Sequence, residues 1–237
     1  MKRHLQKILR IARLMTVITI ITVGIYQAQI LHHENDPVVA GTHAPVNESP
    51  AAVALTKLEV KGRAPKTGYS RAAFSNGWGE IEHCDVRNYI LTRDLTDVIF
   101  VPNTCKVQRG TLIDPYTAST LFFLRGPDTS DDIQIDHVVP LSDAWQKGAQ
   151  ALTAYERYAF ANDPLNLLAV QGDANQAKSD GDAATWLPAN KAYRCPSVAR
   201  QIAVKLKYKL WVTRAEYDTM AGILARCPAQ LLPGEKP

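Results

Sequence analysis

The chain has 237 residues, of which 46% are hydrophobic and 21% charged, a composition typical of a globular protein with one ordinary domain and a leader. Its formal net charge of +4 arises at the N-terminus, because the first thirty residues hold five of the 27 basic residues and no acid. The other 22 bases face 23 acids, so overall charge gives no argument for a nucleic-acid partner, and only a local basic face could supply one.

The N-terminal residues have the pattern of an export leader. Residues 1–13 are basic, and Leu14–Tyr26 is an uncharged apolar run of signal-peptide length, short for a membrane span. The cleavage site after this run is poorly defined, so residues 1–30 are predicted to be either a signal peptide or an N-terminal membrane anchor with the rest outside. Residues 31–54, rich in proline and small residues, are predicted to be a flexible linker, and residues 55–237 the folded domain.

Four cysteines, Cys84, Cys105, Cys195 and Cys227, fit two disulfides in an exported protein. Of the three possible pairings we favour the sequential one, Cys84–Cys105 and Cys195–Cys227, because each bridge would close a loop within one segment. A metal site is a weak alternative, since no CxxC spacing is present.

The first half of the domain is predicted to contain short strands joined by turns. Leu55–Val60 indicates a strand or an extended entry, and Asp97–Val101 with Cys105–Leu112 indicates a hairpin. Ser119–Arg125 carries four consecutive large apolar residues and is predicted to lie in the core.

Two arginines, Arg87 and Arg93, lie in a charged stretch between these elements. One hypothesis is that they contact the substrate phosphate or brace acids of the site, because a planar guanidinium suits both tasks. The other is a solvated face whose charges pair with one another.

The most informative stretch is residues 133–180. It opens with an alternating apolar strand that presents Asp136 and His137 side by side and stops at Pro140. Neighbouring residues of a regular strand point to opposite faces, so the residues up to Pro140 are expected to bend and turn the imidazole toward the acid.

A second strand and a short helix complete this stretch. Asn166–Val170 predicts the strand, and the polar residues after it predict a helix that carries Asn175 and Lys178 on one face. Leu141–Gly148 and Thr153–Ala161, between the two strands, have helical spacing. Two strands and a helix that present Asp, His, Asn and Lys would make a compact site for one hard cation and one phosphate.

The C-terminal part is predicted to be helical. Val198–Tyr208 fits a helix, although its alternating apolar residues also fit a strand, and Thr213–Glu216 is a capping box that predicts a last helix to about Ala225. Residues 191–214 contain no acid and form the one local basic tract that could hold a polyanion. A solvated face explains this tract nearly as well.

The central stretch resembles the HNH, or His-Me finger (ββα-metal), nucleases. The order Asp136-His137, Asn166, Asn175 and Lys178 is similar to the C-terminal nuclease domain of GmrSD-type restriction enzymes, and also to the HNH domain of CRISPR effector nucleases. Over about residues 55–227 the chain looks like secreted actinobacterial HNH-family proteins. The shared phrases are Cys84-Asp85-Val86-Arg87-Asn88, Arg93-Asp94-Leu95, Gly110-Thr111-Leu112-Ile113-Asp114-Pro115-Tyr116-Thr117 and Phe160-Ala161-Asn162-Asp163-Pro164.

This resemblance implies an α+β fold with a ββα-metal core at residues 133–180, additional helices and small β elements. It implies a metal-dependent endonuclease that hydrolyses phosphodiester bonds of DNA, with RNA as a further candidate substrate. The chain departs from many HNH enzymes by having Asn175 where they use His, a change that an amide oxygen ligand can tolerate.

Each site residue then has an expected role. His137 would be the general base, since a pKa near 6.5 suits proton transfer at neutral pH, and the resemblance assigns Asn166 to fixing the loop around it. Asp136 and Asn175 would hold Mg²⁺ or Mn²⁺ through oxygen. Lys178 would neutralise phosphate charge.

Two other functions remain as alternatives. One is a non-catalytic nucleic-acid-binding protein on the cell surface, as in DNA uptake, and the other is a toxin or effector nuclease delivered to competitors. A serine hydrolase and a P-loop enzyme are excluded because their motifs are missing. The expected location is secreted or extracellular, with a membrane contact only through an uncleaved N-terminal segment; the sequence does not give the oligomeric state.

Overall fold

The computed structural model describes residues 49–235. The predicted leader and most of the predicted linker lie outside the described residues. The chain divides into residues 1–44 and a unit of residues 45–237, and every element below belongs to the second unit. None of the helices within residues 49–235 combines the length and apolarity that a membrane crossing requires.

The described unit is α+β, as predicted. Its strands are β1 (Glu80–Ile81), β2 (Cys84–Asp85), β3 (Thr96–Phe100), β4 (Val107–Ile113), β5 (Thr120–Leu124), β6 (Ile133–His137) and β7 (Leu167–Gln171). Its α-helices are α2 (Pro50–Leu55), α3 (Val86–Asp94), α4 (Leu141–Trp145), α5 (Ala154–Asn162), α6 (Gly172–Lys178), α7 (Arg194–Lys207) and α8 (Arg214–Leu224). Short 3-10 turns are η1 (Arg71–Ala73), η2 (Ala149–Ala151) and η3 (Lys191–Tyr193).

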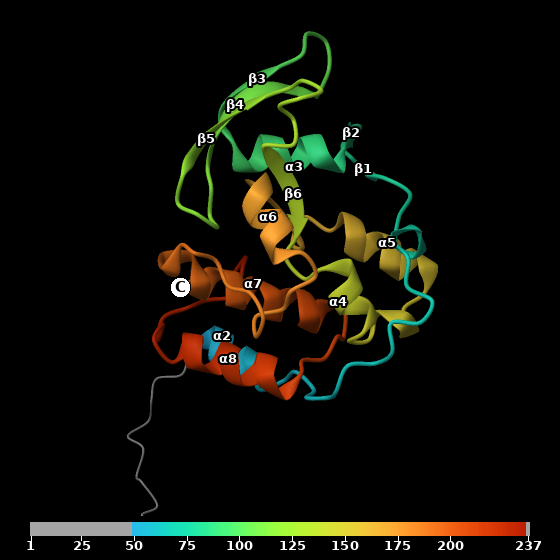
Figure 1. Cartoon of the computed structure of the whole chain (residues 1–237), viewed down its shortest axis with the longest axis vertical. Coiled ribbons are helices and arrows are strands. Elements are labelled where there is room, and N and C mark those ends of the chain that lie inside the picture. Colours follow the sequence, from blue (N-terminus) through green and yellow to red (C-terminus); the bar gives the residue numbers. More distant parts are fainter. Residues whose placement is uncertain (1–48, 236–237) are drawn as a thin grey trace, which may run out of the picture. The chain divides into compact units, whose positions relative to one another are not determined.

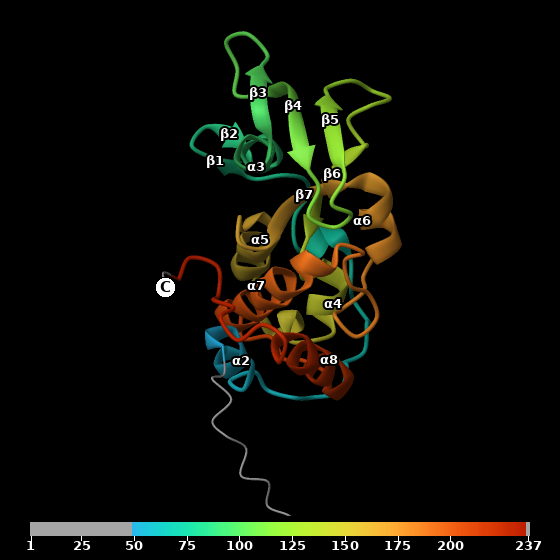
Figure 2. The same ribbon diagram turned by 90° about the vertical axis from the view of Figure 1, so that its left-hand side faces the viewer.

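The three-stranded antiparallel sheet β3-β4-β5 lies at one end of the unit, with α3 beside it (Figures 1 and 2). The predicted hairpin is β3 and β4. The prediction of core for Ser119–Arg125 is only half right: Phe123 is 2% exposed and packs against Leu91 and Ile133 in one cluster, whereas Phe122 is 79% exposed. The cause is strand alternation, which sends successive side chains to opposite faces of β5.

The middle of the unit holds β6, β7 and α6 (Figure 2). The two strands pair antiparallel, from Ile133 opposite Gln171 to His137 opposite Leu167. α6 follows β7 directly at Gly172, where a Cβ would collide with the carbonyl oxygen of Asp131, so only glycine fits this junction. The predicted order of strand, strand and helix is therefore present.

The other end of the unit is helical, with α2 and α8 packed on α7 (Figure 2). Residues 50–54 were expected to belong to the linker, but they are helical, and Ala51 and Leu55 are buried in a cluster with Ile202 and Met220. For residues 55–60, expected to be a strand or an extended entry, the strand is wrong: Leu55 ends α2, and only Val60 makes an isolated bridge. The predicted helix over residues 198–208 is confirmed as part of α7, which excludes the strand alternative.

The predicted covalent and capping features are confirmed. Disulfides join Cys84 to Cys105 and Cys195 to Cys227, with Cα atoms 5.8 and 6.5 Å apart. The first ties the start of α3 to the β3–β4 turn, and the second ties the start of α7 to the residues after α8. Thr213 caps α8 with a complete capping box.

Candidate active site

A cleft of about 500 Å³ opens beside β6, between α4, α6 and the segment that precedes η1. Asp136, His137 and Asn175 all line it. These are three of the five residues expected to form the core of the site. The other two, Asn166 and Lys178, are buried next to it.

His137 lies at the end of β6 and is only 8% exposed. Its Nε2 is 2.9 Å from the carbonyl oxygen of Ala161, which only accepts, so the proton of the neutral ring belongs on Nε2 and Nδ1 is left as a base. Trp78 stacks on the imidazole with ring centroids 6.0 Å apart and planes at 12°. Burial lowers the pKa of His137 to about 4, so the ring is neutral at pH 7.

Asn166 fixes the chain immediately after His137. Its Oδ1 accepts the N–H of Val139 at 2.9 Å, and its Nδ2 donates to the carbonyl oxygens of Val139 at 3.3 Å and Phe160 at 3.4 Å. The side chain thereby joins the bend after β6 to the end of α5, which supplies the carbonyl partner of His137. These hydrogen bonds are the contacts that a loop-fixing residue requires, and the role expected of Asn166 stays a prediction.

Asp136 is a buried carboxylate held from two sides. Its Oδ2 accepts the hydroxyl of Tyr116 at 2.5 Å, and its Oδ1 accepts Nζ of Lys178 at 2.9 Å. Burial and the neighbouring carboxylate raise the pKa of Tyr116 well above its usual value, so this hydroxyl keeps its proton and donates. Each carboxylate oxygen has a further lone pair for another partner.

Lys178 does not face the cleft. It is 3% exposed, and its Nζ donates to the carbonyl oxygen of His137 as well as to Asp136, both at 2.9 Å. The expected contact between Lys178 and a substrate phosphate is therefore contradicted by this structure. Its ammonium instead neutralises Asp136 from within and holds the end of β6.

Asn175 presents an amide oxygen to the cleft. Its Nδ2 donates to Oε1 of Gln134 at 2.9 Å, and its Oδ1 has no hydrogen-bond donor within residues 49–235. That oxygen and the carboxylate of Asp136 form a hard donor set, which fits a magnesium or manganese ion. Within the same residues no group of three or more His, Cys, Asp or Glu side chains is arranged to hold a metal ion, so an ion at Asp136 and Asn175 would keep water in much of its coordination shell.

Arg87 and Arg93 support the strands and do not line the cleft. Arg87 donates to the carbonyl oxygens of Ser130 at 2.9 Å and Ile133 at 3.1 Å, and Arg93 donates to that of Leu167 at 2.7 Å. Both guanidinium groups are thus held at the beginnings of β6 and β7. The hypothesis that they contact substrate is not supported, and neither bonds to an acid of the cleft.

The basic tract of residues 191–214 is largely committed to contacts within the protein. Arg200 donates to the carbonyl oxygens of Pro164, Leu165 and Leu167, and Lys205 is fully buried. Lys207 and Arg214 pair with Asp163 and Asp218, whereas Lys191 and Lys209 are exposed, so only part of the charge of this tract is available to a polyanion.

Four residues that the sequence did not single out belong to the site. Tyr116 lies in one of the phrases shared with the resembling proteins but was given no role, and Trp78 lies between Gly77 and Gly79. Lys66 and Arg71 line the cleft from the segment that precedes Trp78. An aromatic residue flanked by glycines was the one sequence signal that could have directed attention there.

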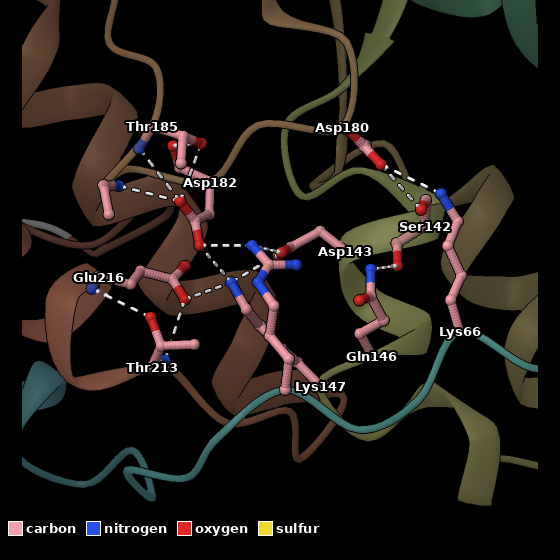
Figure 3. A network of polar contacts seen from close by, with 12 residues as sticks. Lys66, Ser142, Asp143, Gln146, Lys147, Asp180, Asp182, Thr185, Thr213 and Glu216 are labelled. Carbon is pink, nitrogen blue, oxygen red and sulfur yellow. Dashed lines mark hydrogen bonds and ion pairs between the residues drawn. The ribbon is translucent and has the colours of Figure 1, made fainter.

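Beside the cleft lies a largely buried network of three cations and three acids, of which Figure 3 labels Lys147, Asp143, Asp182 and Glu216. Its members are Arg63, Lys147, Lys205, Asp143, Asp182 and Glu216. Nζ of Lys147 is 2.7 Å from an oxygen of Asp143, 2.7 Å from Asp182 and 2.6 Å from Glu216.

Two acids of the network are close in sequence to residues that line one wall of the cleft. Asp143 follows Ser142, and Asp182 comes two residues after Asp180, while Ser142 and Asp180 both line the cleft. Oγ of Ser142 donates to Asp180 at 3.1 Å (Figure 3). The buried charges therefore help to fix the positions of this wall.

Comparison with known proteins identifies related sequences. Residues 85–223 match the family described as GmrSD restriction endonucleases, C-terminal domain. A protein of Arthroderma benhamiae, described as an uncharacterized secreted protein, is 37% identical over 199 residues, which is 80% of this chain and 94% of that protein. No solved structure matches the chain. The family match contains all five expected core residues and begins after Lys66, Arg71 and Trp78.

Proposed function

The chain belongs to the family of GmrSD restriction endonuclease C-terminal domains, and from this we propose that it is an exported, metal-dependent endonuclease that hydrolyses phosphodiester bonds of DNA. β6, β7 and α6 would be its ββα-metal core. The observation that carries the proposal is the position of His137, which lines one cleft together with the oxygen donors Asp136 and Asn175.

His137 would activate the attacking water. Its hydrogen bond to Ala161 orients the ring and fixes the proton on Nε2, so Nδ1 can accept the proton of a water molecule. The water oxygen would bond to phosphorus while the bond from phosphorus to the leaving oxygen breaks. Trp78, stacked on the ring with centroids 6.0 Å apart, would shield part of one face of the imidazole from solvent.

Asp136 and Asn175 would hold Mg²⁺ or Mn²⁺. When bound, the ion would neutralise charge on the phosphoryl oxygens as a Lewis acid. Tyr116 and Lys178 would orient the carboxylate of Asp136 by hydrogen bonds to its two oxygens. The positive charge of Lys178 would also moderate the affinity of this site for a cation.

Export is supported by three observations. The leader has a basic stretch followed by an apolar run, both disulfides suit an oxidising compartment, and the Arthroderma benhamiae relative is described as secreted. RNA is a second candidate substrate of the same chemistry.

The test is cleavage of supercoiled plasmid by the oxidised protein with Mg²⁺ or Mn²⁺, with EDTA, and with two histidine variants. We expect nicking that EDTA abolishes and that His137→Asn lowers by about 10²- to 10⁴-fold, the usual contribution of a general base. His83→Asn is the matched control, because His83 is exposed and outside the cleft and asparagine tolerates its positive φ of 65°.

The opposite outcome is equally informative. A folded protein that retards DNA in a gel but cuts neither DNA nor RNA with either ion would replace the proposal with a non-catalytic binding protein.

A further inference from the structure

The segment of residues 62–78 forms a wall of the cleft although it precedes the family-matched range. It contributes Lys66, Tyr69 and Arg71 to the lining. It also contributes Trp78, which stacks on His137. The surroundings of the site are therefore completed by residues outside the part of the chain that matches the family.

The backbone that carries Arg71 is firmly anchored. Arg71 begins the turn η1, whose N-cap is Ser70, with the hydroxyl accepting the N–H of Ala73 at 3.1 Å. Phe74, at the end of this turn, is buried against Phe160 with ring centroids 5.8 Å apart. Nε of Arg157 donates to the carbonyl oxygen of Ala73 at 2.8 Å. A side chain on so well held a turn loses little further backbone freedom when a ligand binds.

Arg71 is exposed, and its guanidinium makes no hydrogen bond or ion pair with any of residues 49–235. The other cation of the lining, Lys66, lies 3.3 Å from Asp180 and above the ring of Tyr69. Lys178 already neutralises Asp136. Unlike Lys66 and Lys178, Arg71 has no acidic partner among residues 49–235, so its positive charge is available to bind an anionic ligand.

We infer that Arg71 binds a phosphate of the nucleic-acid backbone in the cleft, a role that rests on the proposed function. A guanidinium offers paired N–H donors that match two phosphate oxygens, and it stays charged at all relevant pH values. Such a contact positions the strand beside His137 without reading base sequence. Arg71 therefore takes the role for which Arg87, Arg93 and Lys178 were considered.

The experiment measures binding separately from cleavage. Anisotropy of a short fluorescein-labelled DNA duplex is recorded with the full oxidised chain, in EDTA and in Ca²⁺, over about 50 to 200 mM salt. We expect Arg71→Ala to weaken binding about tenfold, the equivalent of one hydrogen bond to a charged group. The slope of log affinity against log salt should fall by about 0.9, the value for one lost phosphate contact on a duplex.

Two variants separate a specific contact from general charge or folding effects. Arg226→Ala removes the same charge from an exposed position outside the cleft and should bind as wild type does. Arg71→Lys keeps the charge and should retain the salt slope while losing part of the affinity. Unfolding curves of all three variants should match wild type, because the substituted side chains are exposed.

The inference is overturned if Arg71→Ala binds like Arg226→Ala, or if the wild-type chain binds no DNA in either buffer. If Arg71→Ala still cleaves plasmid and its DNA affinity and KM equal those of wild type, Arg71 has no role in substrate binding. The proposed endonuclease function would then still stand. Binding that depends on Arg71 without any cleavage would support the phosphate contact of Arg71 and contradict the proposed endonuclease function.

Discussion

The burial of His137 has a consequence for stability in mild acid. Its pKa in the folded protein is about 4, below the usual value of about 6.5, so the unfolded chain takes up the proton first. The free energy of unfolding should therefore fall by about 3 kcal/mol as the pH drops from about 6.5 to 4, and then level off. Urea unfolding at several pH values measures this loss.

The same experiment on His137→Asn isolates the contribution of the ring, because asparagine does not titrate. A variant whose stability changes with pH as steeply as that of wild type in this window would show that another group is responsible. Trp78→Ala provides a second check, since uncovering the imidazole should move the pKa of His137 toward its usual value in an NMR titration.

At the scale of single residues, the sequence predicted which side chains matter better than where they point. Asp136, His137 and Asn175 line one cleft, as their motif indicated. The position of the Lys178 side chain was predicted wrongly, because spacing along a helix indicates which face a residue lies on but not how deeply its side chain is buried. Its long side chain reaches back into the protein to Asp136, a partner 42 residues away, which no local pattern reveals.

At the scale of elements, the junction of β7 and α6 depends on Gly172. In Gly172→Ala the added methyl would meet the carbonyl oxygen of Asp131, so the strand or the helix has to shift. We expect a loss of about 1 to 3 kcal/mol of folding free energy, the usual cost of overpacking a close contact. Because α6 carries Asn175, plasmid cleavage should fall in this variant as well.

Gly222→Ala in α8 is the control for this substitution. Nothing lies within 4 Å of the position that a Cβ at residue 222 would take, and alanine is the better helix former. The free energy of unfolding of this variant should therefore rise by about 0.5 to 1 kcal/mol. Chemical denaturation compares the two variants directly. Equal effects of the two substitutions would contradict the close approach at Gly172.

The elements that were predicted well are those with local signals. The capping box at Thr213–Glu216 and the alternating strand before Pro140 needed no distant partner. α2 was missed because its alanines and proline resemble a linker by composition. Ser49 as N-cap and Pro50 at the first helical position were the start signals that distinguish it from one.

At the scale of the whole molecule, the buried ion network joins α4, α7, α8 and the loop after α6. Lys147 is fully buried between three acids, so Lys147→Met should destabilise the protein by about 3 to 5 kcal/mol by leaving buried carboxylates uncompensated. Lys66→Met, which breaks an exposed pair, should cost no more than about 1 kcal/mol. Denaturant unfolding of the two variants measures the difference.

The network also sets the behaviour of the protein in stronger acid. Burial alone would raise the pKa of Asp182, but the hydrogen bond and charge of Lys147, together with Arg63, lower it to about 2. This carboxylate therefore stabilises the fold above pH 3.8, and its contribution of about 2 kcal/mol is lost as the pH falls toward 2. In Lys147→Met that loss should be smaller; an unchanged acid profile would show that Lys147 does not control Asp182.

The sequence does not reveal this network, because all of its ion pairs except Asp143–Lys147 join residues that are more than four positions apart in the chain. Lys147 and Glu216 are separated by 69 positions, and the lysines of α7 looked like a surface tract. Which charges meet in a buried cluster depends on the complete fold, whereas a sequence motif can be recognised from its own few residues.

The position of α2 bears on how the chain could be cut for study. A fragment limited to residues 85–223 would lose α2, whose Ala51 and Leu55 share a cluster with Met220, and would part Cys195 from Cys227. It would also lose Arg63 and so leave three buried acids with two cations. The family-matched stretch is thus shorter than the smallest self-sufficient piece, which has to include both Ser49 and Cys227.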